Sequence, residues 1–327
     1  MEPGSTSLET AGAELIIRVG TRGSQLARKQ TGQLIERLRG LGQRVEEVVI
    51  STRGDNRQDL PIAQIGDDGV FVRELERGLL DGRIDAAVHS LKDLPTAATA
   101  GLDLACVPLR ATPFDVLISR TGIGLRELPP AAVVGTASVR RRVQLKALRP
   151  DLNVVGIRGN VDSRLRRLTE GSLDAVVLAA AGLERLGYAG PISEVLRPPD
   201  FFPAVAQGAL VIQIRADDSR LRRAIAPLDD ADTHLAATAE RSLLAALAGG
   251  CLAPIGSWGR FEEDRQLHLG GRVLGEQNDA VVAVTAKAAA AAGSLADAEL
   301  LGRRVAEELL SQGAGPLLEQ MRTQGQV

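Results

Sequence analysis

The pattern of apolar and polar positions near the N-terminus predicts a strand that leads directly into a helix. In "LIIRVGTRGSQLARKQTGQLIERL", a β-branched stretch ends at a Gly-Thr turn, and apolar residues then recur at helical spacing. Ser24 stands where it can cap this helix, because its hydroxyl can accept a bond from an unpaired N–H of the first turn. The apolar positions of the helix are Leu26, Leu34, Ile35 and Leu38.

The same design returns about 115 residues later. The stretch "AAVVGTASVRRRVQLKAL" again runs strand, Gly-Thr, Ser, helix. A second pair of similar segments, "LLDGRIDAAVHSLKDL" and "LTEGSLDAVVLAAAGL", places Asp85 opposite Asp174 at helix-to-strand junctions. Two α/β lobes built on one plan account for both repeats.

Where a strand leads directly into a helix, the N-terminus of that helix is a suitable binding site for an anion. The first N–H groups of the helix lack partners, and the positive end of its dipole favours a carboxylate or phosphate. The first turn also carries Arg22, and the second carries Arg140 and Arg141. Taken alone, either turn is explained equally well by simple helix capping.

The remaining segments predict a return to the first lobe and then a third domain. The strand "ALVIQIRADD" (209 to 218) follows the Pro-rich "LRPPDFFPAV", as a crossover would. Beyond it we expect a helix at roughly 233 to 248, strands in "LHLGGRV" and "DAVVAVTAKA", and a helix from about Leu295 to Leu310. The predicted class is α/β, with three domains that each bury a core. Their boundaries are 14–108 with 209–226, 109–208, and 227–327 for a small α+β C-terminal domain.

Composition narrows the choice of partner. A formal charge of −2 in 327 residues predicts no general attraction to nucleic acid or to anionic membranes. Apolar runs fall short of the ~20 residues that a bilayer span needs, and the N-terminal segment has neither a basic start nor an apolar signal core. We therefore expect a cytoplasmic enzyme or binding protein.

The two cysteines lie in contrasting settings. Cys106, in the apolar run "LDLACVPL", is predicted to lie in the core. Cys251, in "LAALAGGCLAPIGSW", lies between a glycine pair and Pro254, in a loop where a thiol stays reachable. Such different settings do not suggest a disulfide, and they give Cys251 a chemical role.

Seven motifs in order resemble the porphobilinogen deaminase family, also called hydroxymethylbilane synthase. They are "VGTRGSQLA", "AAVHSLKDLPT", "VGTASVRRRVQL", "IRGNVDSRL", "AAAGLERLG", "PAVAQGAL" and "GGCLAPIGS", and the likeness runs from about Ile16 to Leu310. The resemblance implies two lobes like those of type II periplasmic solute-binding proteins. It also implies a dipyrromethane cofactor joined to Cys251 by a thioether. The activity implied is that of a transferase, which condenses four porphobilinogen molecules, with loss of ammonia, into hydroxymethylbilane.

The resemblance also assigns roles to residues. Asp93, in "HSLKDLP", corresponds to the catalytic carboxylate, which would stabilise cationic intermediates and pass protons; locally, it could equally cap a turn before Pro95. Arginine forks that bind carboxylates contribute about 1.5–3 kcal/mol each. The implied cofactor- and substrate-binding residues are Arg22, Ser24, Ser90, Lys92, Thr136, Ser138, Arg140, Arg141, Arg158, Arg164 and Arg185. His89 is predicted to be a packing residue, and no metal site is expected.

Two positions depart from the family pattern. The chain reads Gly66-Asp67-Asp68-Gly69 where the family usually has Gly-Gly-Lys-Gly, so two carboxylates replace a cation in a predicted lid from about Arg53 to Gly69, for which Arg73 would compensate. Ala206 replaces a common glycine, which we expect to be tolerated if its φ is negative.

Two other functions remain open on residue patterns alone. A two-lobed cytoplasmic protein that binds an anion or solute without catalysis would show the same helix ends, although it has no use for the Cys251 loop. Cys251 could also be a nucleophile in acyl transfer, but none of the three histidines lies in a convincing partner motif. In each case we expect a monomer.

Overall fold

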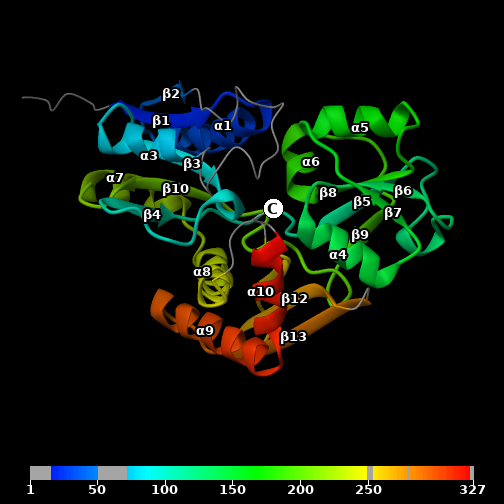
Figure 1. Ribbon diagram of the computed structural model, residues 1–327. Helices are drawn as coiled ribbons and strands as arrows, with labels where there is room; N and C mark the ends of the chain where they lie inside the picture. The colour runs from blue at the N-terminus through cyan, green and yellow to red at the C-terminus, as the bar shows by residue number, and fades with distance from the viewer. Residues whose placement is uncertain (1–15, 51–71, 249–252, 278–279, 325–327) are drawn as a thin grey trace, which may run out of the picture.

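The computed structural model describes residues 16–50, 72–248, 253–277 and 280–324. Cys251, the Gly66 to Gly69 stretch and the predicted lid lie outside these ranges. Figure 1 shows two α/β lobes side by side and a C-terminal domain beneath both. No helix in the described ranges has both the length and the apolar character needed to cross a bilayer.

Lobe 1 contains a sheet with the strand order β2-β1-β3-β10-β4. Strands β1, β2 and β3 are parallel, whereas β10 runs antiparallel to its neighbours β3 and β4. The elements of this lobe are β1 (Ile17–Arg22), α1 (Gln25–Gly40), β2 (Val45–Ile50), α3 (Arg73–Leu80), β3 (Ala86–Ser90), the 3-10 turn η1 (Leu91–Asp93), β4 (Leu102–Cys106), β10 (Leu210–Arg215), α7 (Ser219–Ile225) and η3 (Ala226–Leu228).

Lobe 2 repeats this topology with the strand order β7-β6-β8-β5-β9. Strand β5 occupies the antiparallel position that β10 occupies in lobe 1. Each lobe thus receives its antiparallel strand directly from the other lobe. The elements of lobe 2 are β5 (Asp115–Ser119), η2 (Leu125–Glu127), β6 (Val133–Gly135), α4 (Val139–Leu148), β7 (Asn153–Val155), α5 (Val161–Thr169), β8 (Ala175–Ala179), α6 (Ala180–Leu186) and β9 (Glu194–Leu196).

The predicted correspondence between Asp85 and Asp174 has a structural basis. Asp85 precedes β3, and its Oδ2 accepts the backbone N–H of Arg18 on β1 at 2.9 Å. Asp174 precedes β8, and its Oδ2 accepts the backbone N–H of Val133 at 2.8 Å. Each carboxylate therefore ties the start of one central strand to its parallel neighbour, which fixes the register of both sheets in the same way.

The C-terminal domain is an antiparallel sheet, β11-β12-β13, packed against helices α8 and α9. Its elements are α8 (Ala231–Ala246), β11 (Ile255–Phe261), β12 (Leu267–Gln277), β13 (Ala280–Ala290), α9 (Leu295–Ser311) and α10 (Ala314–Gln324). The predicted helices and the two predicted strands are confirmed, and β11 is an additional strand. The α/β class with a small α+β domain is likewise confirmed.

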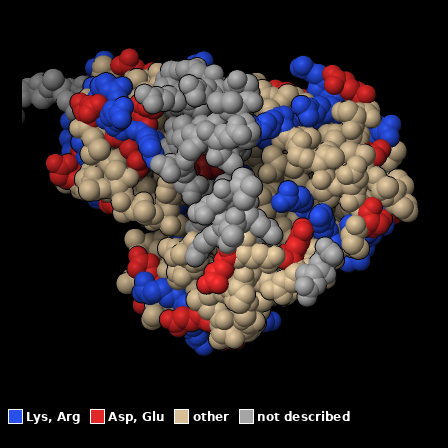
Figure 2. Space-filling model, in the orientation of Figure 1, with Lys and Arg blue, Asp and Glu red and all other residues tan. Residues whose placement is uncertain are grey.

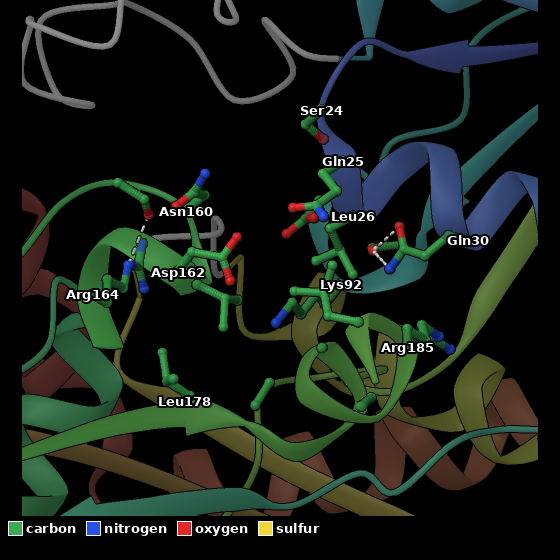
Figure 3. A pocket seen from close by; sticks show the side chains of 18 of the residues that line it. Ser24, Gln25, Leu26, Gln30, Lys92, Asn160, Asp162, Arg164, Leu178 and Arg185 are labelled. Atoms are coloured by element: carbon green, nitrogen blue, oxygen red, sulfur yellow. Dashed lines mark hydrogen bonds between the residues drawn. The ribbon is translucent and has the colours of Figure 1, made fainter. Parts of the chain in front are cut away.

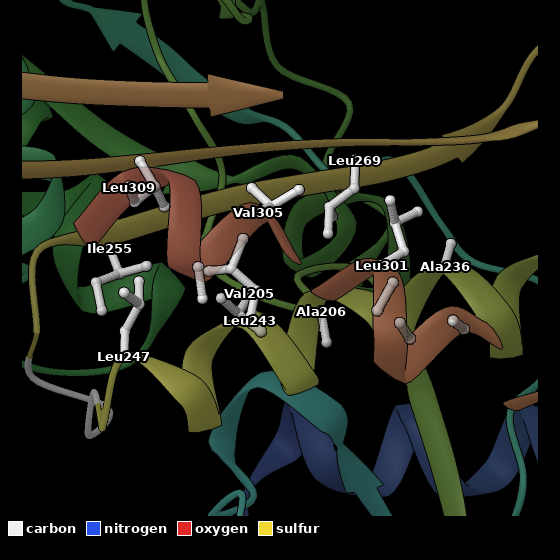
Figure 4. Packing of buried hydrophobic residues seen from close by; sticks show 14 of the residues in the cluster. Val205, Ala206, Ala236, Leu243, Leu247, Ile255, Leu269, Leu301, Val305 and Leu309 are labelled. Atoms are coloured by element: carbon white, nitrogen blue, oxygen red, sulfur yellow. The ribbon is translucent and has the colours of Figure 1, made fainter. Parts of the chain in front are cut away.

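The expectation of a separate core for each domain is wrong for the C-terminal domain. Its apolar cluster continues into lobe 1, where Leu91 and Leu94 are only 2% and 5% exposed. Val205, on the returning hinge segment, belongs to the same cluster as Leu243 of α8 and Leu247, the residue that follows this helix (Figure 4). The loop that contains Asp93 therefore rests on the C-terminal domain.

Two connecting segments form a hinge between the lobes. The Ala111 N–H of the outgoing segment donates to the Gly208 carbonyl of the returning segment at 3.2 Å. Gly208 has φ +88°, and a Cβ there would lie 2.5 Å from the Ala111 carbonyl oxygen. Only glycine fits this close approach.

The expectation for Ala206 is wrong in its premise, because its φ is +57°. Non-glycine residues rarely adopt this left-handed region. The Ala206 N–H donates to Glu240 Oε2 and the methyl group is fully buried, so the surrounding contacts hold the backbone in this conformation.

Candidate functional site

A cavity of about 800 Å³ lies between the two lobes. In Figure 3, Gln25, Leu26 and Gln30 of α1 face Asn160 and Asp162 across it. The hinge residues 207–209 complete the lining. Leu26, one of the apolar positions of the predicted helix, lines this cavity.

The lobe 1 wall is built where β1 ends and α1 begins. Arg22, the last residue of β1, lines the cavity. Ser24 lines it too, and its Oγ accepts the Ala27 N–H at 3.3 Å, so it is also the predicted cap. Ser90, at the end of β3, is bonded to Gln30, whose Nε2 lies 3.0 Å from the Ser90 Oγ.

The turn η1 presents one cation and one carboxylate to the cavity. Lys92 Nζ donates to Gln207 Oε1 at 3.3 Å. Burial lowers the pKa of Lys92, and the nearby Asp93 carboxylate partly offsets this effect. Asp93 is exposed, and its carboxylate forms no hydrogen bond or ion pair with any described residue. It is therefore available to a ligand.

The lobe 2 wall is arginine-rich. Arg158 lines the cavity together with Arg164 and Arg185. Arg164 Nε donates to the Gly159 carbonyl at 2.9 Å, and Arg185 Nη2 donates to the Gly208 carbonyl at 2.7 Å. Burial lowers the pKa of both arginines, yet a guanidinium stays protonated in proteins. These backbone bonds fix the two side chains and leave their other N–H groups for a ligand.

Arg140 and Arg141 bind a carboxylate that belongs to the protein. Asp115, at the start of β5, accepts from Arg140 Nη2 at 2.8 Å and from Arg141 Nη2 at 2.7 Å. Burial would raise the pKa of Asp115, but the two guanidinium groups hold it well below its usual range. Arg140 also donates to the Phe202 carbonyl. Arg141 lines the cavity, whereas Arg140 is not among the described lining residues.

Thr136 and Ser138 also lie behind the wall rather than in it. The Ser138 Oγ accepts the Arg141 N–H at 3.4 Å, and the Thr136 Oγ1 accepts the Ser138 N–H at 3.2 Å. Neither residue is among the described residues that line the cavity. In this structure both hydroxyls shape the start of α4.

The charges of the lining determine what the cavity can bind. Two acidic side chains, Asp93 and Asp162, face a larger basic set, and Figure 2 shows basic side chains gathered on the side of lobe 2 that looks toward lobe 1. The basic lining residues are Arg22, Lys92, Arg141, Arg158, Arg164, Arg167 and Arg185. A ligand with several carboxylates suits this surplus of donors.

The sequence pattern did not point to several of these residues. Gln207 links the lobes, since its Nε2 donates to Asp115 Oδ1 at 2.9 Å while its Oε1 accepts from Lys92. Gln30 and Arg167 also line the cavity. A polar residue inside an apolar run, as Asp115 is in "TPFDVLIS", was the available signal for a buried partner.

A second buried ion pair ties the hinge to the C-terminal domain. Arg110 Nη1 lies 2.6 Å from Glu240 Oε1, and both side chains are almost fully buried. Glu240 also accepts the Ala206 and Gly259 N–H groups. One carboxylate of α8 thus holds both hinge segments and β11 together.

Cys106 is fully buried on β4, as predicted. Burial raises the pKa of its thiol to about 12, which makes it inert. His89 is also buried, in agreement with a packing role. No cluster of metal-ligating side chains occurs in the described part of the chain.

The fold and the cavity define a class: a two-lobed α/β protein with a mainly basic cavity between its lobes. Residues 17–223 match the family model described as "Porphobilinogen deaminase, dipyromethane cofactor binding domain". Residues 234–311 match the model of the porphobilinogen deaminase C-terminal domain. The chain belongs to the porphobilinogen deaminase family.

Individual relatives agree with this assignment. The porphobilinogen deaminase of Syntrophobacter fumaroxidans is 46% identical over 308 residues, which cover 94% of this chain and 98% of that protein. The porphobilinogen deaminase of Roseiflexus sp. (strain RS-1) is 47% identical over 304 residues, which cover 92% and 97%. Among solved structures, a nutrient binding protein from Burkholderia cenocepacia is 11% identical, with a TM-score of 0.40 over 64% of this chain and 90% of that one.

Proposed function

We propose that this chain is a porphobilinogen deaminase, a transferase that joins four porphobilinogen molecules into hydroxymethylbilane. In each condensation the carbon–nitrogen bond of the aminomethyl group breaks and ammonia leaves. A carbon–carbon bond forms to the free pyrrole carbon at the chain end, and that carbon loses its proton. Water enters when the finished tetrapyrrole is released. Family membership supports this function over a binding protein without catalysis.

The residues of the cavity fit a dipyrromethane that carries carboxylates. Lys92, Arg22 and Arg158 supply cations, and the bonded Ser90–Gln30 pair supplies neutral donors. When bound, this group supplies the pyrrole carbon to which the first substrate is joined. We propose Cys251 as its attachment point, as the family resemblance implies. Arg140, Thr136 and Ser138 would act indirectly, through Asp115 and through the start of α4.

Asp93 is the proposed catalytic residue. Loss of ammonia leaves positive charge on the substrate, and a fixed carboxylate lowers the energy of that state. The same group can protonate the leaving amine and accept the proton from the pyrrole carbon. The observation that carries this proposal is the available Asp93 carboxylate in a cavity whose charged lining is mainly basic.

The test combines intact mass with stoichiometry. Purified protein should be heavier than the chain by two pyrrole units, and Cys251→Ser should have the mass of the bare chain and little activity. Each porphobilinogen consumed should release one ammonia. An unmodified parent that binds porphobilinogen without releasing ammonia would establish the binding-protein alternative. We further propose that the protein is cytoplasmic and monomeric.

A further inference from the structure

One arginine of the C-terminal domain binds the backbone of the loop that carries Asp93. Arg241, on α8, directs Nη1 to the Leu94 carbonyl at 3.0 Å and Nη2 to the Pro95 carbonyl at 2.7 Å. Nη1 also lies 3.5 Å from the Leu91 carbonyl. A single planar guanidinium therefore spans the residues on both sides of Lys92 and Asp93.

Apolar packing reinforces this contact. Leu91 and Leu94 are buried in the same cluster as Leu243 of α8 and Leu247, which follows this helix. Because Leu91 and Leu94 pack in this cluster, Lys92 and Asp93, the residues between them, are left to line the cavity. The loop has one side anchored on α8 and the other side exposed to the ligand.

The same helix leads to the proposed attachment point. Arg241 follows Glu240, which holds the hinge, and Cys251 comes ten residues after Arg241 in the sequence. Helix α8 runs as far as Ala246, so the first half of this interval is helical. The helix that binds the Asp93 loop therefore comes shortly before the proposed attachment residue in the sequence.

We propose that Arg241 is a positioning residue for Asp93, because it binds the backbone on both sides of that residue and so holds the carboxylate at the cavity wall. This inference rests on the proposed function. Arg241 is not among the described residues that line the cavity, and its printed bonds go to the carbonyls of Leu94 and Pro95 and, more weakly, of Leu91. A displacement of about 1 Å at the reacting centre can cost about 100-fold in rate, so loss of this contact affects turnover more than binding.

The test is a double-mutant cycle with Asp93. Arg241→Met keeps the apolar stem and removes the donors. We expect kcat to fall by about 10–100-fold, with KM within about 3-fold of the parent and the cofactor still attached. In an Asp93→Asn background, the same change should cost less than about 2-fold, because the group it positions has lost its charge. Single-turnover mass spectrometry, which counts added pyrrole units over time, can follow these slow variants.

The matched control is Arg149→Met. Arg149 also donates to three backbone carbonyls, those of Leu125, Arg126 and Leu128, but in lobe 2 and outside the cavity lining. Its turnover should match that of the parent even if its thermal stability falls. If Arg241→Met fails to fold, Arg241→Lys, which retains one cationic donor, should show an intermediate loss of kcat.

Two results would overturn the positioning role: parent-like kcat in Arg241→Met, or an equal loss of rate with and without the Asp93 charge. Neither would affect the proposed function, which fails only if the parent itself lacks the added mass or does not release ammonia.

Discussion

Lys92 Nζ lies 3.3 Å from Oε1 of Gln207, so the cation beside Asp93 is bonded to the hinge rather than to a carboxylate. The other end of the Gln207 amide binds Asp115, which pairs with Arg140 and Arg141. The neutral side chain of Gln207, at the cavity wall, therefore links the cation of Lys92 in lobe 1 to the carboxylate of Asp115 in lobe 2. Its amide orientation is set on both sides, by a donor and by an acceptor.

Gln207→Leu should lower turnover strongly, although the two side chains are similar in size. The change removes the described partner of Lys92 and one donor to Asp115, which keeps its two arginines, and a buried polar group left unpaired costs about 1–3 kcal/mol. We expect turnover to fall at least 10-fold and cofactor content to fall. Gln213→Leu, at a buried glutamine bonded to Glu76, is the control and should load and turn over normally. Equal losses in both variants would indicate a stability effect alone.

Asp93→Asn should separate chemistry from loading. It retains size and hydrogen bonding but removes the charge, so turnover should fall by orders of magnitude with the cofactor attached. Arg22→Leu removes a carboxylate partner and should yield protein that lacks the cofactor or stalls with partial chains. Mass spectrometry with limiting porphobilinogen counts the pyrrole units on each variant. Parent-rate elongation by Asp93→Asn would remove its catalytic assignment.

His89 predicts a loss of stability in mild acid. Burial lowers its pKa to about 4, the Arg22 charge adds to this effect, and the nearby Gln213 side chain opposes it. In the unfolded state His89 has the ordinary histidine pKa, so between pH 6.5 and 4 the unfolded state binds more protons than the folded state does. The free energy of unfolding is therefore unaffected by the titration of His89 above pH 6.5. It falls by roughly 2–3 kcal/mol as the pH drops from 6.5 toward 4.

Urea unfolding at pH 7 and pH 4.5 would measure this loss. In His89→Met the fall in unfolding free energy between the two pH values should be smaller by about 2 kcal/mol. An unchanged pH dependence would show that His89 titrates alike in both states.

Because Ala206 has a left-handed backbone conformation, we expect Ala206→Gly to change the free energy of unfolding very little. Ala206→Gly relieves backbone strain of about 1–2 kcal/mol, which offsets the lost methyl burial of about 0.8 kcal/mol and the greater entropy of the unfolded chain. Ala237→Gly, at an equally buried position of α8, loses methyl burial and about 1 kcal/mol of helix propensity. Chemical denaturation should show Ala206→Gly at least 1 kcal/mol more stable than Ala237→Gly. The reverse order would mean that Ala206 is unstrained.

The active protein should be a monomer. Residues from both lobes build the cavity within one chain, so a second copy has nothing to add to the described site. Light scattering at micromolar concentration should give a mass near 34.5 kDa. A stable dimer of twice that mass would contradict this expectation.

Short-range patterns in the sequence by themselves determined much of the secondary structure and domain organisation of this protein. The strand-turn-helix repeats follow from periodicity, and the caps Ser24 and Ser138 act on N–H groups three residues away. Such interactions span one turn of helix, so a short stretch of sequence specifies them. The paired lobes, the third domain and the arginine-rich turns could therefore be predicted.

Only the tertiary structure decided which of those charges are available to a ligand. Arg140 and Arg141 pair with Asp115, 25 and 26 residues away, and Arg241 reaches Leu94 across 147 residues. Ala206 adopts its left-handed φ although its own propensity opposes it. Burying a charge is costly unless it is paired, so the partner that folding brings close, and not the residue type, determines whether an arginine supports the wall or receives the ligand.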